Sequence, residues 1–379
     1  MRPVDGKLSI DPGIQPTAPS LFLYTRRVDL VNQVEGNWSL VRSGCSLFAS
    51  KSSKWWMQAQ TVSILTLMVS EIVVKDGKVF HLGLTQGELA ENVFLVGDPA
   101  RAVRVSEHFD NIRCEVRNRE YVTFTGTYAG IPMSVIGTGI GVDNVEIALV
   151  EAYTVHAFDF DSSERRADAT PLKFIRIGTS AGVQDDVEPG TMAISTHGLG
   201  LDNGGMFYDH PAADDIVSKI EEHAFEILVH ATPKDARFRG KIIPYASRAT
   251  TEVVSALVGS AEAHNVDYEV GITAATPGFY GASGRYIDGL VNTVPDIKNK
   301  LGALRVGELK VINMEMESSV LFHIAGFLGS PVGTICPIIS KPTASTAILD
   351  YAASIDSAIS IALDAMCRIN GVATPASLT

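Results

Sequence analysis

The chain has 379 residues, of which 46% are hydrophobic, and carries a formal net charge of −12 at pH 7. Such a chain can bury one large core or two modest ones, which is typical of a globular protein and excludes general disorder. Because the charge is negative and Lys and Arg form no cluster, we expect no nucleic acid as a partner.

The N-terminal part differs from the rest of the chain. Residues 1–67 lack the alternating strand and helix signals seen later, so we expect an N-terminal extension that is disordered or not part of the mature fold, followed by a folded domain at 68–379. The apolar stretch at 55–74 falls short of the about 20 apolar residues of a membrane span, so we expect no membrane association. Polar residues interrupt this stretch, among them Gln58, Gln60, Ser63, Thr66, Ser70 and Glu71.

The four cysteines lie far apart and form no C-x-x-C pair, which argues against a disulfide scaffold or a zinc site. A reducing, cytoplasmic compartment fits this usage best. They are Cys45, Cys114, Cys336 and Cys367.

After the extension, apolar runs and helical patterns follow one another. The helical patterns lie at 142–158, 212–231 and 351–367, and the segment at 161–170 has the composition of a solvated loop. Apolar runs predict strands covered on both faces, and hence an α/β fold with a central β-sheet flanked by helices. These runs lie at 93–96, 132–136, 174–177, 191–195, 311–312 and 332–335.

Three glycine-containing turns follow apolar runs, at 97–101, 137–141 and 176–180. Ligands collect at the carboxyl ends of strands in such sheets, so these turns indicate one shared site, although tight strand-to-helix packing would also explain them. Arg101 closes the first turn and Arg176 opens the third, and guanidinium groups bind phosphate oxygens in pairs. The alternative for Arg101 is a solvated residue in the first turn of a helix.

At these residues the chain resembles the nucleoside phosphorylases, and within them the uridine phosphorylases. The resemblance covers about residues 68–370 and implies a single catalytic domain built on a central mixed β-sheet. Its most specific parts are the Gly-Asp-Pro-x-Arg turn and the Glu-Met-Glu motif. The matching segments are 79–84, 97–101, 118–121, 137–141, 176–179, 279–285 and 313–318.

The resemblance assigns the phosphate and ribose sites. It implies that phosphate is surrounded by Gly97, Arg101, Arg176 and Thr179, with Arg119 reaching in from a neighbouring subunit, so that the protein is a homodimer at minimum with shared active sites. Ribose is expected to contact His81 of the neighbour through its 5′-hydroxyl group, and also Thr179, Glu315, Met316 and Glu317. Taken alone, the two glutamates could instead complement a helix N-terminus, and His81 could be a satisfied core histidine.

The base site departs from the family pattern. The resemblance implies that the base stacks on Phe279 and is hydrogen-bonded by Arg285, but Ser283 stands where a Gln is expected. Ser is short, so it would need a water molecule or a shifted loop to reach the base. Lys341 near another family arginine and Ala181 in place of a usual Gly are further departures.

The implied reaction is reversible phosphorolysis of a pyrimidine nucleoside, uridine above others, to uracil and ribose 1-phosphate. Its catalytic residues are Arg101, Arg176, Arg285 and Glu317, with inorganic phosphate as co-substrate and no organic cofactor. An interface cation is implied near Glu120, Ile140 and Asn144, although one carboxylate per chain supports only a weak site.

Three alternatives remain open from the sequence. A purine nucleoside phosphorylase shares the phosphate and ribose residues, and Ser283 leaves the choice of base open. A nucleosidase that uses water would have little need of three arginines directed at phosphate. A non-catalytic nucleoside-binding or storage protein on the same fold is the third.

Overall fold

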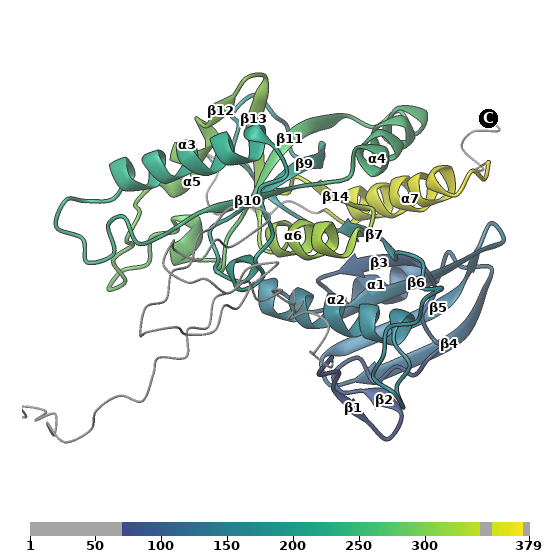
Figure 1. Ribbon diagram of the computed structural model, residues 1–379. Coiled ribbons are helices and arrows are strands. Elements are labelled where there is room, and N and C mark those ends of the chain that lie inside the picture. Colours follow the sequence, from purple (N-terminus) through teal and green to yellow (C-terminus); the bar gives the residue numbers. More distant parts are fainter. Residues whose placement is uncertain (1–69, 342–350, 374–379) are drawn as a thin grey trace, which may run out of the picture. The chain divides into compact units, whose positions relative to one another are not determined.

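A computed structural model describes residues 70–341 and 351–373, whose secondary structure is shown in Figure 1. The helices are α1 (Pro99–Ser106), α2 (Val142–Ala157), α3 (Asp215–Ala231), α4 (Thr251–Ala263), α5 (Ile297–Gly302), α6 (Ser318–Leu328) and α7 (Ala352–Ile369), with short 3₁₀ turns η2 (Gly205–Phe207) and η3 (Gly281–Ser283). The strands are β1 (Val74–Lys75), β2 (Lys78–Val79), β3 (Asn92–Val96), β4 (Asn111–Asn118), β5 (Tyr121–Tyr128), β6 (Ile131–Gly137), β7 (Lys173–Ile177), β8 (Ala181–Gly182), β9 (Met192–Gly200), β10 (Tyr245–Arg248), β11 (Tyr268–Ala275), β12 (Arg305–Val306), β13 (Leu309–Glu315) and β14 (Val332–Pro337).

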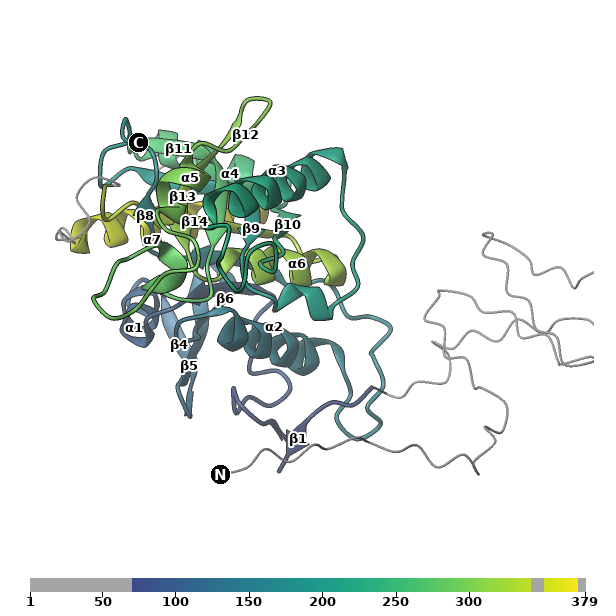
Figure 2. The same cartoon turned by 90° about the vertical axis from the view of Figure 1, so that its left-hand side faces the viewer.

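The main sheet is mixed, which confirms the predicted fold class. Its order is β12-β13-β11-β9-β14-β7-β3-β6-β5-β4, with β10 and β8 pairing to β9 and β13. The strands β6, β3, β7 and β14 run parallel, and so do β9, β11 and β13. Antiparallel pairs join β14 to β9 and extend the sheet through β5 to β4. Figure 2 shows β5 beside α1.

The central strands are covered on both faces. In β3, Phe94 and Val96 belong to an apolar cluster formed with α1, α4 and α7, whereas Val93 and Leu95 belong to a second cluster formed with α2 and α6. Side chains alternate across a strand, so a wholly apolar strand must be buried on its two sides. Figure 1 shows α4 beside α7, and α2 beside α6.

The predicted elements correspond closely to the observed ones. Every predicted apolar run lies within a strand, except that Thr191 falls one residue before β9, and each predicted helix overlaps α2, α3 or α7. The prediction for α3 was wrong at its start, because Asp214 caps the helix by accepting hydrogen bonds from the backbone N–H groups of Ile216 and Val217. No helix or strand forms within 161–170, as expected, apart from an isolated bridge at Arg165.

The predicted extension at 1–67, and most of the apolar stretch at 55–74, lie outside the described residues. The boundary near residue 68 therefore stays a prediction. Within 70–341 and 351–373, no helix is long and apolar enough to cross a membrane. Cys114, Cys336 and Cys367 are free thiols.

Candidate active site

Two strands that are distant in the sheet order end at the same place. After β7 the chain continues into β8, whose Ala181 and Gly182 pair with Met314 and Asn313 of β13. This two-residue strand carries the carboxyl end of β7 to that of β13, the kind of location where ligands bind in α/β sheets. Arg176 of β7 thereby meets Glu315 at the end of β13.

Arg176, Glu315 and Glu317 form a buried ion trio. Arg176 Nη1 lies 3.1 Å from Glu315 Oε2, and Nη2 contacts the Glu317 carboxylate. The three residues are 4%, 5% and 2% exposed. Burial alone would lower the pKa of Arg176, but Glu317 and Glu315 outweigh it and raise that pKa above its usual value. Charges this deeply buried persist only when each is paired and hydrogen-bonded.

Glu315 also holds the start of α6. Its two carboxylate oxygens accept hydrogen bonds from the backbone N–H groups of Glu317 (3.1 Å) and Ser318 (2.9 Å). Glu315 therefore complements the N-terminus of a helix, as the alternative interpretation of the two glutamates expected. Burial raises the pKa of Glu315 despite the neighbouring Arg176 guanidinium.

The three glycine turns converge on this trio. Glu317 Oε1 accepts a hydrogen bond from the backbone N–H of Gly141, at 2.8 Å, which joins the 137–141 turn to the Glu-Met-Glu motif. A Cβ atom at Gly97 would lie 4.0 Å from both Arg176 Nη2 and Glu317 Oε1. A Cβ atom at Gly178 would lie only 2.0 Å from Arg176 Nη1, so only glycine leaves room for this guanidinium.

Arg101 is buried at the N-terminus of α1, and the alternative of a solvated residue is wrong. It is 7% exposed, and its Nη1 donates to the Ile177 carbonyl at 3.0 Å. Burial, and then the nearby Arg176 guanidinium, lower the pKa of Arg101. No described carboxylate pairs with Arg101, so its charge has no ionic partner in the folded part of the chain.

The predicted base residues lie together in the loop between β11 and α5. Arg285 stacks its guanidinium 4.2 Å from the centre of the Phe279 ring and donates through Nε to the Phe279 carbonyl. Ser283 Oγ donates to the Gly278 carbonyl at 2.9 Å, so its hydroxyl is engaged within the loop. Phe279 remains 46% exposed and available for stacking.

Lys298 is a neighbour of this loop that the sequence did not reveal. Its Nζ donates to the Lys341 carbonyl at 3.4 Å, and burial together with the nearby Arg285 charge lowers its pKa. A lysine in a short charged helix gives no local signal of such a position.

His81 and Arg119 form a separate cluster around Phe80. The Arg119 guanidinium lies 4.6 Å from the centre of the Phe80 ring, and the His81 ring packs edge-on against the same ring. Arg119 adopts a left-handed backbone (φ 53°) in the turn between β4 and β5. Within the described residues, no hydrogen bond or ion pair joins His81 or Arg119 to the buried ion trio. Thr179 and Met316 are half-buried. Thr179 follows Arg176 by three residues in the sequence, and Met316 lies between Glu315 and Glu317.

The residues expected at a cation site are only partly assembled. Asn144 Nδ2 donates to the Ile140 carbonyl at 3.4 Å, whereas Glu120 is exposed in the β4–β5 turn. Among the residues that the structure describes, no three His, Cys, Asp or Glu side chains are grouped so that they could hold a metal ion.

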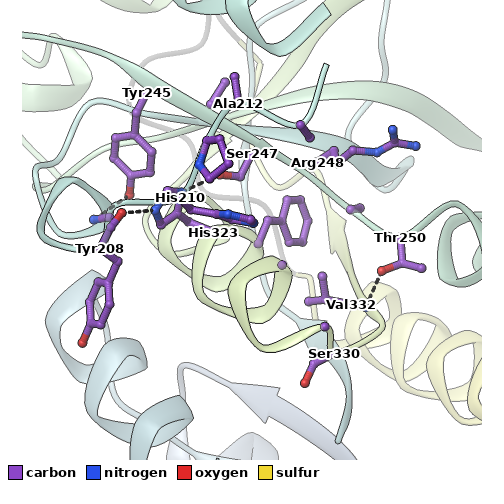
Figure 3. A pocket seen from close by; sticks show the side chains of 18 of the residues that line it. Tyr208, His210, Ala212, Tyr245, Ser247, Arg248, Thr250, His323, Ser330 and Val332 are labelled. Atoms are coloured by element: carbon purple, nitrogen blue, oxygen red, sulfur yellow. Dashed lines mark hydrogen bonds between the residues drawn. The ribbon is translucent and has the colours of Figure 1, made fainter. Parts of the chain in front are cut away.

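A separate cavity of about 940 Å³ lies between α6, β10 and η2 (Figure 3). Both ring nitrogens of its His323 are engaged, with the Ser247 hydroxyl and the Tyr208 carbonyl. None of the predicted site residues lines this cavity.

The mixed sheet, with an arginine-glutamate centre at the carboxyl ends of β7 and β13, is consistent with a protein of the phosphorylase class. The chain belongs to the phosphorylase superfamily, whose model matches residues 92–369, which confirms the resemblance.

Particular relatives include uridine and purine enzymes. A uridine phosphorylase from Thermococcus kodakarensis is 29% identical over 268 residues, 70% of this chain and 79% of the relative. A guanosine phosphorylase from Halorubrum lacusprofundi is 24% identical over 258 residues, 68% of this chain and 81% of the relative. A solved nucleoside phosphorylase from Trypanosoma brucei, described as showing uridine phosphorylase activity, is 30% identical with a TM-score of 0.71, covering 78% of this chain and 99% of the other.

Proposed function

We propose that this protein catalyses the reversible phosphorolysis of uridine to uracil and ribose 1-phosphate. The observation that carries the proposal is the buried guanidinium of Arg101, which pairs with no carboxylate of the described residues and lies beside the buried ion trio at the carboxyl ends of β7 and β13 in a phosphorylase superfamily member. The similarity to two proteins associated with uridine phosphorylase activity supports uridine as the substrate.

Phosphate binds between Arg101 and Arg176 in this proposal. Arg101 is buried and lacks an ionic partner among the described residues. A negatively charged phosphate oxygen therefore pairs with its guanidinium in this proposal. In this proposal Gly97, which lies beside Arg176 and Glu317, and Thr179, three residues after Arg176 in the chain, let the anion approach the backbone.

The ribose lies against Glu317 and Met316. The carboxylate of Glu317 accepts hydrogen bonds from the vicinal hydroxyl groups and exchanges its contact with Arg176 for them. As the glycosidic bond stretches, the sugar becomes an oxocarbenium-like cation, and the adjacent phosphate stabilises it and then bonds to its anomeric carbon.

The departing base leaves with negative charge. In this proposal uracil stacks on Phe279, and Arg285 moves from the Phe279 ring to donate to a carbonyl of the base. A positioned donor of this kind contributes roughly 3 kcal/mol to lowering the barrier. The engaged hydroxyl of Ser283 favours contact with the base through a bridging water molecule.

The proposed assembly is a homodimer in which His81 and Arg119 complete the site of the partner. Within the described residues of one chain, no hydrogen bond or ion pair joins them to the buried ion trio, which supports donation to a second chain. The proposal includes an interface cation near Glu120, Ile140 and Asn144. It also includes a cytoplasmic location, because free buried thiols such as Cys336 suit a reducing compartment.

The test is a panel of nucleosides assayed with and without phosphate. Release of uracil from uridine only in the presence of phosphate is the expected result. Cleavage of inosine or guanosine without cleavage of uridine would favour the purine alternative, which the guanosine phosphorylase relative supports. Release of base at the same rate without phosphate would identify a nucleosidase, and tight binding without turnover a storage protein.

A further inference from the structure

One buried carboxylate, which no sequence motif marks, binds both the backbone N–H and the ring of His81. Glu151 lies on the inner face of α2 and is 8% exposed. Its oxygens accept hydrogen bonds from the backbone N–H groups of His81 (2.9 Å to each oxygen) and Leu82 (2.7 Å). The ring Nδ1 of His81 lies 2.7 Å from Glu151 Oε1.

Asn118 binds the backbone carbonyl groups around His81. Its Nδ2 donates to the carbonyl groups of His81 (2.7 Å) and Phe80 (3.1 Å). Asn118 also fills the space above Gly83, where a Cβ atom would lie 2.9 Å from the Asn118 Cβ. The backbone around His81 is therefore fixed at both its N–H and its C=O groups.

This arrangement determines which ring nitrogen carries the proton. An ionised carboxylate only accepts hydrogen bonds, so the Nδ1 that faces Glu151 must donate. The lone pair of a neutral ring is then on Nε2. The His81 side chain is 28% exposed, and within the described residues Nε2 has no hydrogen-bond partner.

We propose that Glu151 is a positioning residue that fixes the tautomer of His81 and aims its Nε2 at the 5′-hydroxyl group of the nucleoside in the partner subunit. The proposal rests on the proposed function, because it needs a ribose within reach of His81. Glu151 itself touches no substrate and acts through the imidazole ring.

The kinetic test pairs Glu151→Gln with a substrate that lacks the hydroxyl group. We expect kcat/KM for uridine to fall by roughly 3- to 10-fold, the loss typical of one hydrogen bond to an uncharged group. For 5′-deoxyuridine the variant and the wild type should agree within about twofold, since no hydroxyl group is there to accept or lose that bond. His81→Ala should show the same pattern, and adding Glu151→Gln to it should change nothing further.

Glu146→Gln is the matched control, because Glu146 lies on the same helix and contacts the Tyr208 hydroxyl instead. It should leave both substrates unaffected. Equal losses of Glu151→Gln on uridine and 5′-deoxyuridine, or no loss on either, would overturn the proposal. If Glu151→Gln does not fold, Glu151→Asp keeps the charge but withdraws it from the ring, and the same comparison applies.

Nitrogen NMR of labelled histidine separates this proposal from the proposed function. The His81 signals, identified by their loss in His81→Ala, should report a proton on Nδ1 in the wild type and a changed tautomer in Glu151→Gln. If the wild type cleaves neither nucleoside, the proposed function fails while the NMR result still decides the role of Glu151. A proton on Nε2 in the wild type would refute the positioning role.

Discussion

Replacing Arg176 with Met should destabilise the protein strongly, and more so at neutral than at acidic pH. The substitution removes the guanidinium but fills most of its volume, and it leaves Glu315 and Glu317 buried beside each other at 5% and 2% exposure. Removing one member of a buried ion pair costs about 3–5 kcal/mol, because the remaining charge has no compensation. We expect the free energy of unfolding at pH 8 to fall by about that amount.

The pH dependence follows from the carboxyl groups left behind. Burial raises the pKa of Glu315, and the Arg176 guanidinium opposes that rise, so losing it raises the pKa further. Such a carboxyl group holds an extra proton in the folded state between its unfolded pKa, about 4.3, and its folded pKa. The free energy of unfolding therefore falls as the pH rises through this interval, and the variant should recover much of its deficit near pH 5.

Urea unfolding at pH 5 and pH 8, at one protein concentration, measures both effects. Adding Glu315→Gln and Glu317→Gln to Arg176→Met removes all charge from the trio and should restore most of the stability, while phosphorolysis stays absent. An unfolding midpoint of Arg176→Met equal to that of the wild type at pH 8, or a deficit that does not change with pH, would refute this account of the trio.

Three further substitutions test separate parts of the site. Arg101→Met should lower kcat/KM for phosphate by roughly 100-fold. It should not lower the urea midpoint, because it removes a buried charge that has no ionic partner among the described residues. A destabilised variant would show that Arg101 is structural. Ser283→Ala should change kcat/KM for uridine by less than about threefold, since the hydroxyl bonds the Gly278 carbonyl, and a larger loss would indicate direct contact with the base. Arg101→Met and Arg119→Met chains, each expected to be nearly inactive alone, should recover about a quarter of wild-type activity when co-expressed, because half of the dimers carry one intact site. No recovery would exclude a shared site.

The sequence predicted the central strands well because burial on both faces leaves an unbroken apolar run, as in β3. It missed β5, a buried strand rich in threonine, and the edge strand β4, although in β4 Ile112, Cys114 and Val116 alternate with polar residues at the period of a strand. An edge strand with one wet face has no apolar run, so a search for runs passes over it. The signal was present in the alternation.

The sequence named candidate site residues but could not show the contacts among them. Arg176 and Glu317 are 141 residues apart, and the two-residue strand β8 that brings them together has no sequence signature. The sequence therefore could not show that Arg176 is already paired with two carboxylates. Glu151 was missed for a related reason: one glutamate in a helical pattern looks solvated until His81, 70 residues away, is seen against it.

The charges around the site also bear on how phosphate and protons are exchanged with the solution. Arg101, Arg176, Glu315 and Glu317 sum to zero when both carboxyl groups are ionised, so under the proposed function a phosphate dianion entering this buried space brings an excess of two negative charges. We expect Glu315, whose pKa burial already raises, to take up a compensating proton. In the proposed dimer, Arg119 of the partner subunit would supply the rest of the positive charge. We therefore expect binding of phosphate to take up protons and to stabilise the dimer. The measured affinity for phosphate should then depend on pH and on protein concentration.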